Sequence, residues 1–551
     1  MKHFTFAKPK AAGFALLAIS LLASACSAGG KEGSTSSPSS SAPPSQSPKE
    51  TQAANTKYAQ KLGLKFMLYV FDSKTALPPA ANDFVKKKIE EKFNVDLKID
   101  YMTYGADFNN KLNVMLAGGD LPDFFIADAG VSQKYVNDGL VADLSSYLTP
   151  QRMPNYFKVI QQDEVKSYQL KGAVFGRAPI PWERNMPVSY YIRKDWLDKF
   201  GLTPPKTYDE LLQAMRKFTN DDPDGNGKKD TYGFSAAAGG DRLPMDFPQL
   251  LQQGLAGSFQ ITGDEFSDNV TSPKMQEVLQ GVKDMIKEGI VDPDWFVGKS
   301  PSHIDKAIQG KIGVIYSSGD RNFALDSDPN SVQSKTKALN PKAEWLPIFP
   351  FNTPYIGSEN GPGNAAPFMF PKAVADKNPE KIQRVIDILD WLASEEGYLL
   401  THYGIEGTHY KKDGKKITLI PEAYERDIAK NGNFLDGLYS FFMRVTPDVL
   451  GLEYIDPRMS DRDRSILKTI YGYPKHKGLP ISPAPPQGMN IGDFRKEMAK
   501  MQMKVIFDDK DASNWPKYRE ELMTKYNGQK IFQAYVDQTN EATGKKLVPF
   551  K

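Results

Sequence analysis

The chain has 551 residues, of which 40% are hydrophobic and 25% charged, and this is enough for two or more domains with large cores. Its formal net charge is +3, but Lys2, Lys8 and Lys10 lie in an N-terminal segment without acidic residues, so the remainder is neutral. A neutral body argues against nucleic acid as a partner, because phosphate binding needs a basic surface.

Residues 1–25 are typical of a secretory signal peptide. Basic residues precede an apolar or small run from Ala11 to Ala25, which is too short for an ordinary transmembrane helix. The small residues before Cys26 resemble a bacterial lipobox, although the leucine stands four rather than three positions before the cysteine. The resemblance implies cleavage before Cys26, a diacylglycerol thioether on its sulfur and an N-acyl chain such as palmitate. Two or more acyl chains anchor a protein stably to a membrane. The alternative is an ordinary signal peptide with an incidental cysteine.

A tether separates this signal from the folded body. Residues 27–55 are mostly Ser, Pro, Gly, Ala and Lys, so they cannot bury enough apolar surface to fold. We expect residues 26–61 to be a lipidated cysteine and a disordered spacer that holds the body away from the membrane. Since Cys26 is the only cysteine, an intrachain disulfide framework and a cysteine-based zinc cluster are excluded.

The first folded stretch predicts a parallel sheet. A nearly continuous apolar run over 64–71 is typical of a buried parallel strand. Apolar residues at helical spacing within 79–93, alternation over 95–101, a helix over 108–116 and a strand at 123–127 complete a βαβαβ order. Ligands of such sheets bind beyond the carboxyl ends of the strands, which here carry Phe71, Asp72, Tyr104 and Asp128.

A proline-rich segment over 172–187 follows and carries Trp182 and Arg184. A strand end and a short helical turn lie between 190 and 201. Thr207 and Glu210 then form a capping box, which predicts the start of a helix whose apolar face runs to Phe218.

A calcium-loop pattern, D-x-D-x-N-G-x-x-D, follows this helix directly. Positions 1, 3, 5, 7 and 9 hold Asp222, Asp224, Asn226, Lys228 and Asp230. Four side-chain oxygens and the Lys228 carbonyl suit a hard cation, and the glycine at position 6 permits the bend. Position 12 is Gly233, which cannot supply the bidentate carboxylate of a complete EF-hand. We expect a structural Ca²⁺ site, and the alternative is a surface turn that binds nothing.

Several phrases of this sequence resemble one family. YYIRKDWLDKFGL, the capped helix and DPDGNGKKD, in that order, are similar to the extracellular solute-binding lipoproteins of bacterial ABC sugar importers, in the large Gram-positive branch. Periplasmic alginate-binding proteins are relatives with a calcium loop at the corresponding place. KLNVMLAGGDLPDFF and YGIEGTHY resemble further parts of the family, and the likeness covers roughly residues 62–545.

The resemblance implies an α/β clamp of two periplasmic-binding-protein-like lobes. Each lobe is expected to be a mostly parallel sheet flanked by helices, with extra C-terminal helices. We assign residues 62–180 plus about 300–360 to the first lobe, and 181–299 plus about 361–551 to the second. In the family a segment like 172–187 leads from one lobe into the other. Further patterns predict helices over 275–289, 382–392 and within 494–535, and a strand over 311–316.

Candidate ligand contacts follow from the chemistry of sugars, whose C–H faces stack on rings and whose hydroxyls bind polar groups. Trp182, Trp345 and Tyr355 lie in loop-like surroundings, whereas Trp196 and Trp391 lie on helices and are assigned to the core. Each candidate has an alternative role in packing, capping or solvation. The polar candidates are Asp72, Asp128, Arg184, Glu359, Asn360 and Glu406.

The predicted function is capture of a carbohydrate and its delivery to an ABC permease. An oligosaccharide suits a body of this size, and we expect a monomer held by its lipid on the extracellular face of the cell membrane. The sequence has no H-E-x-x-H, G-x-S-x-G or P-loop pattern, so no enzymatic activity is predicted. Two alternatives stay open: a secreted polysaccharide-degrading enzyme, and a receptor for a peptide or another solute on the same scaffold.

Overall fold

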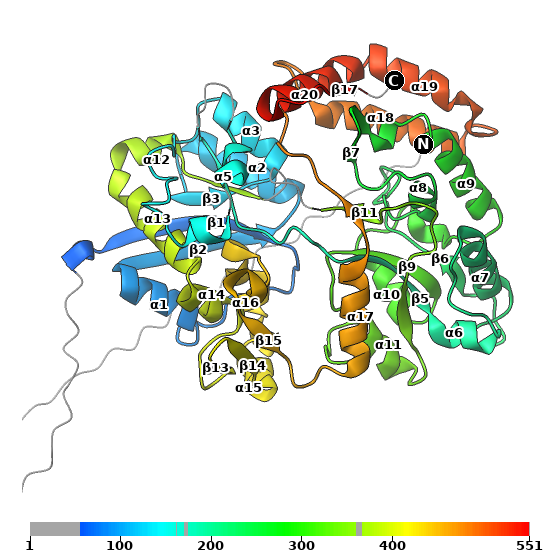
Figure 1. The fold of residues 1–551 in the computed structure, drawn as a ribbon, viewed down its shortest axis with the longest axis horizontal. Coiled ribbons are helices and arrows are strands. Elements are labelled where there is room, and N and C mark those ends of the chain that lie inside the picture. The colour runs from blue at the N-terminus through cyan, green and yellow to red at the C-terminus, as the bar shows by residue number, and fades with distance from the viewer. Residues whose placement is uncertain (1–55, 161, 170–174, 360–365, 550–551) are drawn as a thin grey trace, which may run out of the picture. The chain divides into compact units, whose positions relative to one another are not determined.

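The computed structural model describes residues 56–160, 162–169, 175–359 and 366–549 (Figure 1). The signal peptide, Cys26, most of the tether and Asn360 lie outside the described residues, so the predictions on them stay predictions. The elements below belong to the compact unit Lys57–Lys551. Within the described ranges, no helix combines the length and the apolar character needed to cross a membrane.

A five-stranded sheet forms the centre of the first lobe. Its order is β2 (Val95–Thr103), β1 (Leu62–Val70), β3 (Phe124–Ile126), β12 (Pro367–Met369) and β4 (Ala178–Pro179). β1 pairs in parallel with both β2 and β3, as the βαβαβ order predicts, whereas β12 runs antiparallel to β3 and β4. The second half of β1 is buried without interruption, which explains its continuous apolar run.

Helices and a small sheet complete the first lobe (Figure 1). α1 (Phe84–Phe93) buries Val85, Ile89 and Phe93, which lie one helical turn apart. The other helices are α2 (Ala106–Gly118), α3 (Ala129–Asn137), α4 (Tyr156–Val159), α5 (Gln162–Lys166), α12 (Lys372–Lys377), α13 (Pro379–Leu392), α14 (Glu395–His402), α15 (Pro421–Asp427) and α16 (Phe434–Gly437). The small sheet consists of β13 (Tyr410–Asp413), β14 (Lys416–Leu419) and β15 (Glu453–Ile455).

The second lobe contains a four-stranded sheet with the order β10 (Trp345–Ile348), β5 (Val188–Arg193), β9 (Ile312–Ser318) and β6 (Tyr232–Phe234). β5 is antiparallel to both of its neighbours, and only β6 and β9 pair in parallel. The prediction of a mostly parallel sheet is therefore wrong for this lobe. Its physical reason is that β5 enters from the first lobe, so no crossover helix sets its direction.

The helices of the second lobe include a C-terminal layer formed by the last three. They are α6 (Lys194–Lys199), α7 (Tyr208–Asn220), α8 (Pro248–Gln252), α9 (Met275–Lys287), α10 (Ser302–Ile308), α11 (Val332–Leu339), α17 (Asp461–Gly472), α18 (Ile491–Phe507), α19 (Trp515–Thr524) and α20 (Gly528–Thr543). Two smaller sheets comprise β7 (Phe259–Thr262), β8 (Glu265–Asp268) and β17 (Val548–Pro549), and β11 (Gly357–Ser358) with β16 (Lys475–His476).

The lobe boundaries differ from those expected. β9 and β10, assigned from sequence to the first lobe, pair with β5 of the second, and β12, assigned to the second, pairs with β3 of the first. Helices α12 to α16 also pack into the first core. The apolar pattern of a strand reports that the strand is buried, but it does not specify the sheet in which the strand is buried.

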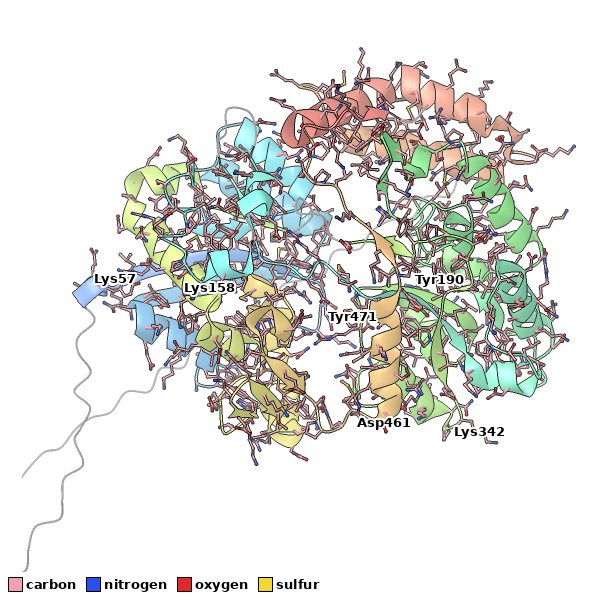
Figure 2. All side chains as sticks on the ribbon, in the orientation of Figure 1. Lys57, Lys158, Tyr190, Lys342, Asp461 and Tyr471 are labelled. Carbon is pink, nitrogen blue, oxygen red and sulfur yellow. The ribbon has the colours of Figure 1, made fainter. Side chains whose placement is uncertain are left out.

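The chain therefore changes lobe three times, namely between β4 and β5, between β11 and β12, and between β15 and α17. The last crossing leads into α17, whose ends are marked by Asp461 and Tyr471 in Figure 2.

Candidate functional site

Two exposed aromatic rings lie where the first strands of the first lobe end. Phe71 follows β1 and is 54% exposed, Tyr104 follows β2 and is 43% exposed, and their ring centroids are 5.8 Å apart. The Tyr104 hydroxyl donates a hydrogen bond to the Asp128 carboxylate, which follows β3, over 2.6 Å. The three strand ends thus meet at one edge and present rings beside a carboxylate.

Trp182 and Arg444 extend this aromatic face. The half-buried Trp182 ring lies 6.5 Å from the Phe71 centroid and 5.3 Å from that of Phe441. The Arg444 guanidinium lies over the rings of Trp182, Phe71 and Phe441, at 5.1, 5.9 and 5.9 Å from their centroids. Phe441 and Arg444 were not sequence candidates, because they lie in and beside the short 3₁₀ segment Tyr439–Met443, where no periodic pattern marks a face.

A charged cluster around Arg321 continues the site into the second lobe. Arg321 follows β9, and its side chain is exposed although groups of both lobes surround it. Tyr471 of α17 interacts with both Arg321 and Glu183, while Tyr403 and Asp436 approach from the first lobe. Desolvation lowers the pKa of Arg321, but these neighbours outweigh it and raise the pKa above its ordinary value, so the guanidinium stays charged.

A half-buried carboxyl, Asp246, lies beside two tyrosines of the second lobe. The hydroxyl of Tyr190, labelled in Figure 2, donates to the Asp246 backbone carbonyl over 2.6 Å, and the Tyr190 and Tyr316 ring centroids are 5.0 Å apart. Desolvation raises the pKa of Asp246 to about 6, although Arg242 opposes this shift. The charge of Arg242 also acts on Tyr104, so this part of the second lobe is within electrostatic reach of the aromatic face.

The remaining sequence candidates have different surroundings. Asp72 is exposed next to Phe71, where its carboxylate accepts from the Lys74 N–H over 2.9 Å. Arg184 is half-exposed and forms an ion pair with Glu164. Glu406 is exposed in the turn before β13.

Tyr355 and Glu359 lie instead beside His476 of β16. The Tyr355 and His476 ring centroids are 5.9 Å apart, and the Glu359 N–H donates to the His476 carbonyl over 2.8 Å. Among the described residues, no hydrogen bond or ring contact connects Tyr355 or Glu359 to the aromatic face around Phe71.

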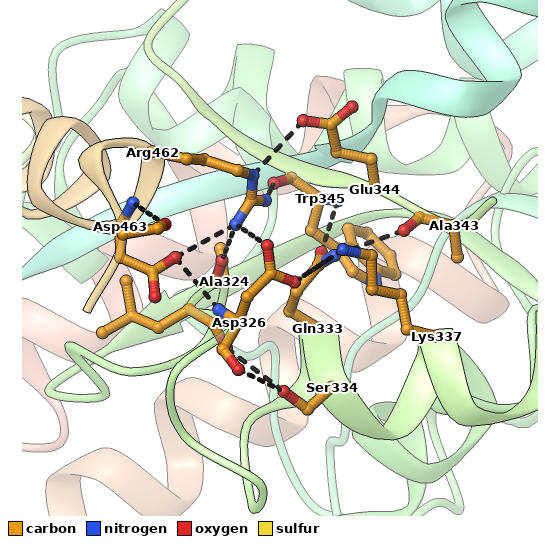
Figure 3. Close-up of polar contacts among 12 residues, drawn as sticks. Ala324, Asp326, Gln333, Ser334, Lys337, Ala343, Glu344, Trp345, Arg462 and Asp463 are labelled. Atoms are coloured by element: carbon orange, nitrogen blue, oxygen red, sulfur yellow. Dashed lines mark hydrogen bonds and ion pairs between the residues drawn. The ribbon is translucent and has the colours of Figure 1, made fainter. Parts of the chain in front are cut away.

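Trp345 corrects the expectation made for it. It is 0% exposed, and its indole N–H donates to the Thr336 hydroxyl over 3.2 Å. Its carbonyl accepts from Arg462, whose guanidinium also pairs with Asp326 (Figure 3). A ring without exposed area offers no surface for stacking. Trp345, the first residue of β10, is therefore a core residue. The prolines near Trp345 in the sequence are typical of a loop, so the sequence pattern does not indicate this strand.

The Asp/Gly loop forms a compact turn after α7. The capping box predicted at Thr207 and Glu210 is present at the start of that helix. One Asp222 carboxylate oxygen accepts from the N–H groups of Gly225 and Asn226, and the other accepts from Gly227, over 3.0 to 3.1 Å. A Cβ at Gly233 would lie 2.6 Å from Met215, so the tight packing of β6 on α7 leaves no room for the missing carboxylate of position 12.

Two lysines contact the same loop. Lys311 places its ammonium nitrogen 2.5 Å from an Asp230 carboxylate oxygen, and Lys199 donates to the Asp222 carbonyl over 2.6 Å. In the described parts of the chain, no three His, Cys, Asp or Glu side chains form a metal centre on their own. The loop nevertheless supplies only oxygen donors, from three carboxylates, the Asn226 amide and backbone carbonyls, and such a donor set fits Ca²⁺ rather than Zn²⁺ or Cu²⁺.

Comparison with known proteins identifies the family. The family of bacterial extracellular solute-binding proteins matches residues 72–398. The chain belongs to this family.

Curated relatives and solved structures agree with this membership. Lipoprotein LipO of Bacillus subtilis is 27% identical over 60% of this chain and 64% of LipO, which is less than two thirds of that relative. The polygalacturonan/rhamnogalacturonan-binding protein YtcQ of the same organism is 26% identical over 72% of this chain and 76% of its own length.

A solute-binding protein from Bifidobacterium longum infantis, described as binding HMO, has a TM-score of 0.66 at 18% identity, covering 88% of this chain and 99% of its own. The alginate-binding protein AlgQ2, solved without calcium ion, gives 0.63 at 18% identity over 86% and 98%. The two-lobe fold expected for this solute-binding protein is thus confirmed.

Proposed function

We propose that this solute-binding protein captures a carbohydrate on the aromatic face formed by Phe71, Tyr104 and Trp182. The observation that carries the proposal is the exposure of two large rings beside the Asp128 carboxylate and the Arg444 guanidinium. Rings stack on sugar C–H faces, while carboxylates and guanidinium groups bind hydroxyls. YtcQ and the Bifidobacterium protein are both described as binding carbohydrates, which supports the same ligand class.

The ligand is an oligosaccharide, and the protein delivers it to an ABC permease without changing a covalent bond. Candidate groups come from the strand ends of the first lobe and from Arg321 and Tyr471 of the second, which is more surface than one sugar ring covers. A ligand that contacts both lobes stabilises a closed form over an open one. Binding therefore shifts the population toward the closed form, and the connections between the lobes serve as the hinge.

A screen of the purified body against oligosaccharides tests this function. We expect one class to raise the melting temperature by ligand linkage and to bind in a one-to-one ratio in calorimetry. Chromatography of the recovered saccharide should return it unchanged. If no saccharide binds, or if the ligand is cleaved during incubation, the proposed function is wrong.

Calcium is proposed as a structural ion of the Asp/Gly loop. Asp222, Asp224, Asn226 and Asp230 would hold it through side-chain oxygens and Lys228 through its carbonyl. The cation would neutralise carboxylates that crowd one turn, where desolvation and the neighbouring Asp222 raise the pKa of Asp224. The Lys311 ammonium lies against Asp230, so it would share that carboxylate with the ion or move from it.

Anchoring through a lipidated Cys26 is proposed as the means by which a monomer stays at the extracellular face of the cell membrane. Cys26→Ala should release the protein from the membrane fraction, whereas the neighbouring Ser27→Ala should not. Equal partitioning of both variants with the membrane would contradict lipid anchoring. The melting temperature of the folded body should be the same in both, because the tether contributes nothing to its cores.

A further inference from the structure

We infer that the site selects neutral saccharides and rejects uronates, because carboxylates outnumber guanidinium groups around the aromatic face. The inference rests on the proposed function and specifies the class of carbohydrate. It also separates this protein from YtcQ, which is described as binding polygalacturonan.

Carboxylates lie on both sides of the exposed rings. Asp128 is bonded to the Tyr104 hydroxyl, so a saccharide stacked on the Phe71 and Tyr104 rings comes close to a negative charge. Asp246 lies in the second lobe beside Arg242, whose charge reaches Tyr104. Desolvation raises the pKa of Asp246 to about 6, which still leaves it mostly ionised at neutral pH. A ligand carboxylate on the Tyr104 ring would therefore meet the like charge of Asp128 at short range, with Asp246 as a further negative group in the second lobe.

The guanidinium groups already have negative or aromatic neighbours. The carboxylates of Glu183, Asp436 and Asp320 interact electrostatically with Arg321, and Asp448 acts on Glu183. At neutral pH the nearby tyrosines carry no charge, so the four carboxylates outnumber the three cations Arg321, Arg444 and Lys475 that act among them. An added uronate would compete with these groups for Arg321 rather than find an unbalanced positive charge.

Arg444 is positioned for hydroxyl groups rather than for a bidentate carboxylate. Its guanidinium lies over three rings, which hold its position through contact with their faces. Arg444 and Arg321 both interact electrostatically with Glu183, so the charge of Arg444 is also partly balanced. Its N–H groups then serve as neutral-ligand donors beside the stacking surface.

A matched pair of ligands tests the inference. Calorimetry compares an oligogalacturonide with its carboxyl-reduced form, which has the same linkage and length and differs in charge, alongside neutral fructo-, galacto-, xylo- and manno-oligosaccharides. We expect a neutral saccharide to bind and the charged member of a matched pair to bind at least about tenfold more weakly than the neutral member. Tighter or equal binding of the uronate overturns the inference and leaves the proposed function intact. Binding of no saccharide overturns both.

Two variants test whether charge is the cause. Asp436→Asn removes a carboxylate near Arg321, and Asp264→Asn makes the same change in the exposed turn between β7 and β8. We expect Asp436→Asn to reduce the preference for the neutral ligand by about threefold or more, and Asp264→Asn to leave it unchanged. An equal preference in both variants overturns the electrostatic origin of the selectivity.

Discussion

The Asp/Gly loop and the aromatic face are assembled in opposite ways. The loop is local: nine consecutive residues supply every proposed oxygen donor, and the N–H groups that donate to the Asp222 carboxylate lie within five residues of it. The aromatic face draws Phe71, Tyr104, Trp182 and Arg444 from four separate segments, and the last of them lies more than two hundred residues beyond the third. Substitutions that disable the loop should therefore leave the aromatic face intact, and substitutions in the aromatic face should leave the loop intact.

The largest expected effect is on the face. Phe71→Ala should weaken saccharide binding by about tenfold or more, because it removes an exposed stacking ring. It should hardly change the melting temperature, since a side chain that is 54% exposed contributes little to the core. Calorimetry and thermal unfolding on the same sample give both values.

The matched control is Phe507→Ala, which removes a ring that is 50% exposed at the end of α18 and contacts Trp295 and Phe296. Binding should be unchanged in this control. If both alanine variants lose affinity equally, the Phe71 ring has no specific role in recognition.

The second effect is on the loop alone. Calcium should raise the melting temperature of the parent by about 2–5 °C over chelator-treated protein, and Asp222→Ala with Asp224→Ala should abolish that difference. The double variant should keep saccharide binding. Asp221→Ala is the control, because this neighbouring acid pairs with Lys217 and lies outside the donor set. A parent that melts at the same temperature with calcium and with chelator would exclude the metal site.

The smallest expected effect concerns Asp246, in the second lobe, and the pH dependence of the free energy of unfolding. Desolvation raises the pKa of Asp246 from 3.8 to about 6, so the native state binds its proton more tightly than the unfolded state. This group therefore lowers the free energy of unfolding progressively as the pH rises from about 4 through about 6. Asp246→Asn should add about 1 kcal/mol of stability above this window and almost nothing below it.

Denaturant unfolding at the two ends of that pH window measures this difference. Asp241→Asn, in the same loop and 77% exposed, should add nothing at either pH. An Asp246→Asn variant that is equally stabilised at both pH values would contradict the titration of Asp246.

Local patterns explain which parts of the structure could be predicted from the sequence. The capping box of Thr207 and Glu210, the continuous apolar run of β1 and the four-residue spacing in α1 each depend on neighbours within one turn or one strand. They were predicted because the physics that forms them is short-ranged. The meeting of Tyr104 and Asp128 also followed, since parallel strand order alone brings such ends together.

Long-range pairing explains what the sequence did not predict. Phe441 and Arg444 reach Trp182 only because the chain returns to the first lobe at β12, and Arg321 gains its neighbours from α17 and the segment near Asp436. The prediction that Trp345 contacts a ligand is wrong for the same reason. Its flanking sequence resembles a loop, but its pairing with Arg193 places it in a buried strand. None of these partners has a spacing that can be read from one sequence.

Intrinsic tryptophan fluorescence tests the central claim, ligand capture on the aromatic face, most directly. Of the six tryptophans, Trp182 is half-buried at that face, whereas Trp196, Trp345 and Trp515 are among the largest fully buried side chains. A saccharide found in the screen should change the emission of the parent, and Trp182→Phe, which keeps a stacking ring, should still bind in calorimetry but lose most of that change. An emission change of the same size in Trp182→Phe, or none in the parent with a tightly bound saccharide, would contradict ligand capture at this face.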